Sequence, residues 1–155
     1  MTNLFGTYEC KIDAKGRLLL PAQLKKQLAP YLGDGFVLKR SVFEQCLELY
    51  TMAEWNAVMS KLNKKNRFQR KVASFIRQFT AGVKSIELDG TGRMLITKDL
   101  VSFAGIEKEV VLTVTVNNII EVWDKDRYES VINNPEEDFG DLAEEVMGDF
   151  EELLQ

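Results

Sequence analysis

The chain has 155 residues, of which 45% are hydrophobic and 28% are charged, with a formal net charge of −4. Length and composition fit a globular domain of ordinary size and exclude a disordered chain. The absence of histidine excludes Ser-His-Asp and Cys-His nucleophile systems and imidazole metal ligands. No run approaches the ~20 apolar residues of a membrane span, and no signal-peptide pattern opens the chain, so we expect a cytoplasmic protein.

The first half of the chain predicts two strand pairs and two helices. The expected elements are strands over residues 5–12 and 17–20, a helix from Pro21 to about Leu28, and strands over 36–40 and 45–50. Gly16 can supply the positive φ of the turn Asp13-Ala14-Lys15-Gly16. Thr51 and Glu54 form a capping box that predicts a helix with Trp55 on its apolar face.

A basic helix is expected between the two halves. Six of the eleven residues over 61–71 are Lys or Arg, and none is acidic. Such a run fits either phosphate contacts or a solvated helix face. The helix predicted over Arg67–Ala81 gathers apolar residues on one face, which we expect in the core. They are Phe68, Val72, Phe75, Ile76 and Phe79.

The second half predicts the same plan again. Strands are expected over residues 83–88, 93–96, 110–116 and 119–123, a helix from Thr97 to Gly105, and a helix capped by Asp124. Asn117-Asn118 suits the tight turn between the last two strands. The two cysteines, Cys10 and Cys46, form no CxxC pair and are expected as buried, reduced thiols, without a metal or cofactor.

The acidic residues are concentrated at the end of the chain. Residues 1–134 hold 20 Lys and Arg against 15 Asp and Glu, a formal charge of +5, whereas residues 135–155 hold nine acidic residues and no basic one. A basic body with an acidic tail is compatible with a polyanionic partner despite the negative total, because local potential governs such contacts.

An internal repeat organises the sequence. Ile12-Asp13-Ala14-Lys15-Gly16-Arg17-Leu18-Leu19-Leu20 returns as Leu88-Asp89-Gly90-Thr91-Gly92-Arg93-Met94-Leu95-Ile96, and Leu47-Glu48-Leu49-Tyr50 returns as Ile120-Glu121-Val122-Trp123. Two ordered matches at nearly equal spacing indicate a duplicated unit. We therefore expect a first repeat over 1–62, a basic connecting helix over 63–82, a second repeat over 83–134 and a tail, expected to be helical, over 135–155.

The repeated Asp-x-x-x-Arg spacing has a physical interpretation. Across a tight turn, Asp13 can bind backbone amides and orient Arg17, and Asp89 can do the same for Arg93. A positioned guanidinium suits phosphate or guanine, and a β-ribbon can enter a major groove. The alternative is that each pair only closes its turn. An enzyme using the two aspartates as acid and base is disfavoured, because each would be ionised beside its Arg.

At these residues the chain resembles the MraZ family. The resemblance spans nearly all of residues 4–134 and rests on the two Asp-x-x-x-Arg motifs and the strand-to-helix segments that follow them. It implies an α+β fold of two tandem swapped-hairpin, AbrB-like units that form one pseudo-dimeric, barrel-like core with flanking helices. It also implies a nucleoid-associated transcriptional regulator that binds short direct repeats in the promoter of the division and cell-wall gene cluster as a ring-shaped homo-oligomer.

The resemblance places the contacts to double-stranded DNA on Lys15, Arg17 and Arg93. Asp13, Gly16, Asp89 and Gly92 would position these side chains, and no catalytic residue, metal or small-molecule substrate is expected. Thr91 stands opposite Lys15, so the second turn carries less charge and is expected to bind more weakly. The alternative is an antitoxin-like protein-binding module whose acidic tail docks on a basic partner. That tail has apolar residues at near-helical spacing, namely Leu142, Val146, Phe150 and Leu153.

Overall fold

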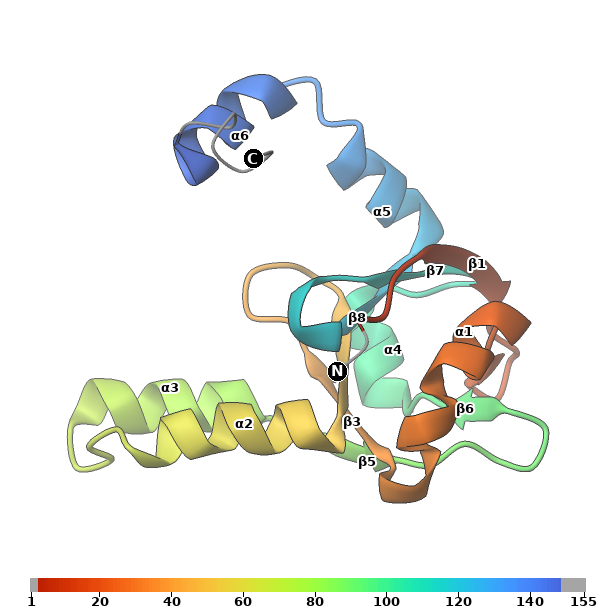
Figure 1. Cartoon of the computed structure of the whole chain (residues 1–155), viewed down its shortest axis with the longest axis horizontal. Coiled ribbons are helices and arrows are strands. Elements are labelled where there is room, and N and C mark those ends of the chain that lie inside the picture. The colour runs from red at the N-terminus through yellow and green to blue at the C-terminus, as the bar shows by residue number, and fades with distance from the viewer. Residues whose placement is uncertain (1–2, 149–155) are drawn as a thin grey trace. The chain divides into compact units, whose positions relative to one another are not determined.

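The computed structural model describes residues 3–148, and its strands form one six-stranded sheet and one two-stranded ribbon (Figure 1). The strands are β1 (Thr7–Lys11), β2 (Arg17–Leu19), β3 (Phe36–Arg40), β4 (Leu47–Thr51), β5 (Lys84–Ile86), β6 (Arg93–Leu95), β7 (Glu109–Val114) and β8 (Ile120–Asp124). The helices are α1 (Ala22–Leu28), α2 (Met52–Asn63), α3 (Arg70–Thr80), α4 (Lys98–Ala104), α5 (Lys125–Ile132) and α6 (Phe139–Met147), with 3-10 turns η1 (Ala29–Asp34) and η2 (Val116–Asn118). The chain forms one compact unit up to Lys125 and a second from Asp126 onward.

Strands of the two repeats are exchanged within the large sheet, whose order is β1-β7-β8-β4-β3-β5. Each repeat forms one hairpin, β3–β4 in the first and β7–β8 in the second, and β4 pairs with β8 between them. The first strand of each repeat joins the other repeat, because β1 pairs with β7 and β5 pairs with β3. Each repeat therefore completes the other's sheet, and the two fold as one unit.

The large sheet is open over residues 3–148, with β1 and β5 at its edges. The expectation of an α+β fold built from two tandem repeats is confirmed, whereas a closed barrel is not found in this part of the chain. The reason lies in the pairing: β2 and β6 bond to each other as a separate ribbon instead of joining the edges of the sheet.

Buried side chains of both repeats form one core. The core takes residues from the large sheet, from the β2–β6 ribbon and from α1 and α4, including the fully buried Leu18, Met94 and Leu24. Cys46 is buried as expected, but Cys10 is only half-buried. Burial raises the pKa of each thiol to about 12, so both stay protonated at neutral pH.

The helices α2 and α3 form an antiparallel hairpin beyond the C-terminal end of β4 (Figure 1). The prediction that the apolar face of the connecting helix lies in the core is wrong. Neither helix holds a buried residue, and Phe68 and Phe75 are 87% and 46% exposed. Phe79 is the anchor, because its ring stacks on Trp55 at 6.1 Å and the ammonium of Lys39 lies 4.2 Å from its centroid.

The capping predictions differ in outcome. The Thr51 hydroxyl accepts a hydrogen bond from the Glu54 amide at 3.3 Å, which confirms the N-cap of α2. Thr97 is the N-cap residue of α4 but makes no capping bond, since its hydroxyl binds Asp99 instead. The left-handed Gly105 ends α4 as expected.

In the second unit, α6 begins after Asp138, whose carboxylate accepts a hydrogen bond from the Asp141 amide at 3.2 Å. Its apolar side chains are solvent-exposed, Phe139 by 79% and Val146 by 73%. Phe150 and Leu153, expected to continue this face, lie outside the described residues. Within residues 3–148, no helix combines the length and the apolar character that crossing a membrane requires.

Candidate functional site

The first Asp-x-x-x-Arg segment folds into a tight turn held by one carboxylate. Oδ1 of Asp13 accepts hydrogen bonds from the amides of Lys15 and Arg17, each at 2.9 Å, and Oδ2 accepts one from Nε of Arg17 at 2.8 Å. Backbone bonds between Asp13 and Arg17 and from Gly16 to Asp13 close the turn. Lys15 is exposed at its tip.

The second segment repeats this geometry. Oδ1 of Asp89 accepts from the amides of Thr91 and Arg93, and Oδ2 accepts from Nε of Arg93, all at 2.9 Å. The hydroxyl of Thr91 adds a fourth bond to Oδ1 at 2.8 Å. In both turns only Nε is engaged, so among the described residues the terminal amino groups of Arg17 and Arg93 have no partner and can donate to a ligand.

Hydrogen bonds to the charged form hold the pKa of both carboxyl groups below the ordinary value. For Asp13 the main cause is the Arg17 amide, followed by the Arg17 side chain. For Asp89 it is the Arg93 amide, followed by the Thr91 hydroxyl. Both carboxylates therefore stay ionised at neutral pH and keep their arginines in place.

The ribbon brings the two turns together. Pairing of β2 with β6 sets Arg17 opposite Leu95 and Leu19 opposite Arg93. Because alternate residues share a face, both arginines lie on the exposed face, at diagonal positions whose Cα atoms are roughly 7–8 Å apart. Leu18 and Met94 fill the opposite, buried face.

Two exposed leucines lie between the arginines. Leu19 is 55% exposed and Leu95 is 52% exposed, whereas Leu18 and Met94, next to them in the two strands, are fully buried. Sequence reasoning treated them only as part of an apolar run. The signal that could have found them is the strict alternation of a ribbon with one face in the core.

The glycines of the two turns lock the repeats together. The carbonyl oxygen of Gly16 accepts from the Ile96 amide at 2.8 Å, and that of Gly92 accepts from the Leu20 amide at 3.1 Å. Both have positive φ, +86° and +85°. Each turn is thus fixed against the opposite repeat, which orients its Arg from two sides.

Lys25 of α1 lies over the second turn. A Cβ built on Gly92 would lie 2.9 Å from both Cε and Nζ of Lys25. The ammonium of Lys25 has no ion-pair partner among the described residues. It therefore adds a cation beside the second turn, which carries less positive charge than the first because Thr91 stands where the first repeat has Lys15. At the first turn the equivalent position on α4 is Val101, which lines an open groove of about 460 Å³ beside Lys15.

The site carries no metal-binding arrangement of side chains. Among residues 3–148, no group of three or more Cys, Asp or Glu residues is placed to hold an ion. Each of the two turn aspartates is occupied by its arginine and backbone amides. The arrangement therefore offers hydrogen-bond donors and positive charge, which suit an anionic partner.

Comparisons with known proteins agree with the duplication. The family model described as "MraZ protein, putative antitoxin-like" matches residues 4–77 and again residues 79–150. The Transcriptional regulator MraZ of Christiangramia forsetii is 63% identical over 148 residues, which cover 96% of this chain and 95% of that protein.

Two further relatives carry the same name. The Transcriptional regulator MraZ of Flavobacterium psychrophilum is 62% identical over 96% of this chain and 94% of its own length, and that of Ligilactobacillus salivarius is 39% identical over 92% and 95%. With two matches to the family model and such identity over nearly the whole length, the chain belongs to the MraZ family of transcriptional regulators, and not to a family of enzymes.

Proposed function

We propose that this protein binds double-stranded promoter DNA through the exposed face of the β2–β6 ribbon. The observation that carries this proposal is the pair of carboxylate-oriented arginines, Arg17 and Arg93, on one face of a two-stranded ribbon. A ribbon of this size fits the major groove, and an arginine fork matches O6 and N7 of guanine or a phosphate.

The neighbouring side chains supply the other contacts. Lys15 at the tip of the first turn and Lys25 beside the second contribute phosphate contacts, which fix the ribbon on the duplex. Leu19 and Leu95 offer apolar contacts of the kind that thymine methyl groups accept. Asp13, Gly16, Asp89 and Gly92 position these groups without touching DNA.

The family resemblance supports a finer proposal. The ribbon would read short direct repeats in the promoter of the division and cell-wall gene cluster, at the nucleoid in the cytoplasm. A ring-shaped homo-oligomer would present many ribbons to repeated sites, and linked weak contacts would then gain affinity through avidity. The fold would be of the swapped-hairpin, AbrB-like type, which the exchange of β1 and β5 supports.

A gel shift on the DNA upstream of the protein's own gene, at two salt concentrations with an unlabelled random competitor, tests the proposal. Replacing Arg17 by Ala should weaken binding by about 1–3 kcal/mol. Arg17→Lys keeps the charge and should retain the salt dependence while losing discrimination against the competitor. Unchanged affinity and salt slope for a folded Arg17→Ala protein would contradict the proposal.

A second candidate function is that of an antitoxin-like, protein-binding module. Two observations favour it: the matching family model is described as antitoxin-like, and the acidic helix α6 is exposed. A pull-down with the full chain and with a chain lacking residues 135–155 tests this candidate. A truncated chain that loses no partner and still binds DNA rejects it.

A further inference from the structure

The exposed face of the β2–β6 ribbon carries two leucines as well as the two arginines. Leu19 and Leu95 are 55% and 52% exposed, and each lies two residues beyond the arginine of its own strand. Because alternate residues of a strand share a face, the four side chains lie together, opposite the buried Leu18 and Met94. A single exposed leucine is ordinary on a protein surface, but two of them on the proposed DNA-binding face are candidates for a contact.

Strand register pairs each leucine with the arginine of the other repeat. Arg17 stands directly opposite Leu95, and Leu19 stands directly opposite Arg93. Directly opposite residues of antiparallel strands have Cβ atoms about 4.5–5.5 Å apart, closer than the two arginines at their diagonal positions. The face therefore consists of two Arg–Leu pairs, and each pair takes one residue from each repeat.

The first turn holds both members of its pair. Cδ1 of Leu95 lies 3.6 Å from the position that a Cβ on Gly16 would occupy, so this leucine packs beside the turn. The same turn orients Arg17 through the carboxylate of Asp13. About half of the Leu95 side chain nevertheless remains exposed. The arginine and the leucine thus keep a fixed separation while both face solvent.

The major-groove edges of the bases match this combination of side chains. Guanine presents the acceptors O6 and N7, which suit the guanidinium fork, and thymine presents an apolar 5-methyl group. A leucine placed against the amino group or ring nitrogen of another base would leave a polar atom without a hydrogen-bond partner. Placed against the methyl group, the leucine buries apolar surface and also excludes water from the neighbouring arginine–guanine bonds.

We propose that each Arg–Leu pair reads a guanine together with the methyl group of a nearby thymine, and that Leu19 and Leu95 are specificity-determining residues. The inference rests on the proposed DNA binding and deepens it by naming the chemical group that each leucine recognises. Since successive base pairs are about 3.4 Å apart, a Cβ separation of roughly 4.5–5.5 Å places the thymine within about two base steps of the guanine.

DNA that lacks the methyl group tests the proposal. The fragment upstream of the protein's own gene is synthesised once with thymidine and once with deoxyuridine in its place. Uracil pairs with adenine and presents O4 as thymine does, and it lacks only the 5-methyl group in the major groove. Gel shifts at one salt concentration then give the affinity of each protein for both fragments.

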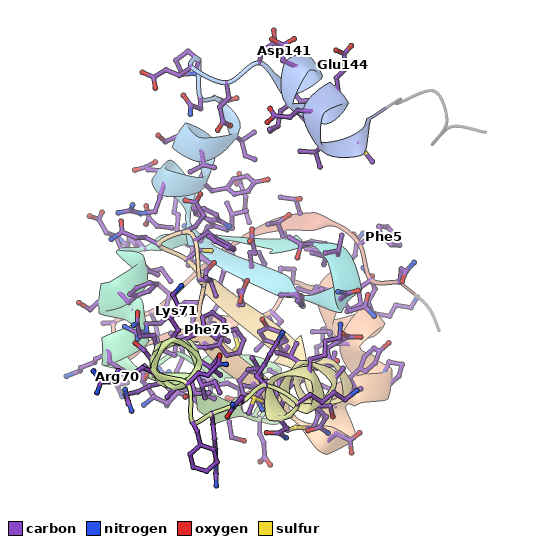
Figure 2. The ribbon with its side chains drawn as sticks, turned by 90° about the vertical axis from the view of Figure 1, so that its left-hand side faces the viewer. Phe5, Arg70, Lys71, Phe75, Asp141 and Glu144 are labelled. Atoms are coloured by element: carbon purple, nitrogen blue, oxygen red, sulfur yellow. The ribbon has the colours of Figure 1, made fainter. Side chains whose placement is uncertain are left out.

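Leucine-to-alanine variants of the full chain locate the contact. The set comprises Leu19→Ala, Leu95→Ala and the double variant, and both positions are exposed, so truncation leaves the core intact. Leu142→Ala is the matched control: Leu142 is 43% exposed and belongs to α6, where Figure 2 shows the side chains of Asp141 and Glu144. These two acidic neighbours disfavour contact with DNA at that leucine.

The wild type and the control should bind the uracil fragment at least about fourfold more weakly than the thymine fragment, since each lost contact removes the gain from burying one methyl group. The double variant should bind both fragments equally, and more weakly than the wild type binds the thymine fragment. Each single variant should retain part of the preference, because one Arg–Leu pair remains. A general effect of uracil on the duplex would instead persist in the double variant.

A wild type that binds the two fragments equally would overturn the proposal, and so would a double variant that keeps the full preference for thymine. A double variant with a smaller mass than the wild type in sedimentation velocity would also overturn it, because the leucines would then pack against another copy. The proposed function fails separately, through a folded Arg17→Ala protein that binds the thymine fragment as tightly as the wild type. Weakened binding by Arg17→Ala, with no effect of the methyl group, would leave DNA binding standing and reject only the role of the leucines.

Discussion

The amide of Ile96, in the second repeat, donates a hydrogen bond of 2.8 Å to the carbonyl oxygen of Gly16, in the first. The approach is so close that a Cβ on Gly16 would overlap the carbonyl oxygen of Ile96. The first turn therefore depends on glycine for two independent reasons, its φ of +86° and this contact.

Replacing Gly16 by Ala should cost more stability than replacing Gly92. At Gly92 the nearest atoms belong to the end of the flexible Lys25 side chain, which can move, so Gly92→Ala should cost about 1–2 kcal/mol for its positive φ. Gly16→Ala should add roughly 1–3 kcal/mol for the backbone clash. Urea unfolding measures both.

Gly90 provides the control within the second turn. It has no positive φ and no atom within 4 Å of a built Cβ, so Gly90→Ala should change the free energy of unfolding by less than about 0.5 kcal/mol. Equal losses for Gly16→Ala and Gly90→Ala would show that the contact with Ile96 does not constrain the turn.

The turn carboxylates predict a loss of stability in acid. Because the folded state lowers the pKa of Asp13 and Asp89, it binds fewer protons than the unfolded chain between the two pKa values. The two carboxylates contribute their full stabilisation of the fold above the ordinary pKa of 3.8, which applies to the unfolded chain. This stabilisation is lost as the pH falls through the lower pKa of the folded state. Asp89→Asn should flatten this dependence in unfolding measured from pH 7 to pH 2.

The same Asp→Asn change at Asp34, an exposed residue outside both turns, supplies the control. The Asp34→Asn protein should lose stability in acid as steeply as the wild type. A wild-type slope retained in Asp89→Asn would mean that the bonds from Arg93 and Thr91 do not stabilise the ionised carboxylate.

Local patterns predicted most of the fold and the two turns. The Asp-x-x-Gly-Arg sequence specifies its own geometry, because the carboxylate, the glycine and the guanidinium that close the turn lie within five residues. The alternation of residues alone could not predict the pairing of β1 with β7 and of β5 with β3, since a hairpin within one repeat satisfies the same alternation.

Amphipathic spacing also proved ambiguous for α3. The spacing shows that a helix has an apolar face, but not whether that face meets the core, a partner helix or another chain. Phe79 and Phe68 belong to the same predicted face, yet only the first is packed. Lys25 was missed because it lies beside Gly92 through the fold, far from it in sequence.

The hairpin should depend on Phe79 much more than on Phe68. Phe79→Ala removes the ring that stacks on Trp55 and covers the ammonium of Lys39, and should cost about 1–3 kcal/mol, less than for a fully buried ring. Phe68→Ala should lower the free energy of unfolding by less than about 0.5 kcal/mol, because Phe68 is 87% exposed. Hydrogen exchange should show α3 opening in Phe79→Ala; unaltered protection would contradict its role as anchor.

Lys25 should contribute to DNA binding through the second turn. Removing one phosphate contact lowers the slope of log K against log salt by about 1. Lys25→Gln should therefore bind promoter DNA more weakly at low salt and converge with the wild type as salt rises. The substitution should leave the fold intact, because Lys25 makes no ion pair among the described residues and its side chain is half-exposed.

The control for Lys25 is its neighbour Lys26, which is exposed one position further along α1. Lys26→Gln removes the same charge, but the side chain of Lys26 is rotated from that of Lys25 by about 100° around the helix. The slope of log K against log salt should therefore change less in Lys26→Gln than in Lys25→Gln. Equal changes in the two variants would indicate general attraction to a basic body. A change confined to Lys25→Gln, and lost when Arg93 is already Ala, would show that Lys25 and Arg93 act on the same stretch of DNA.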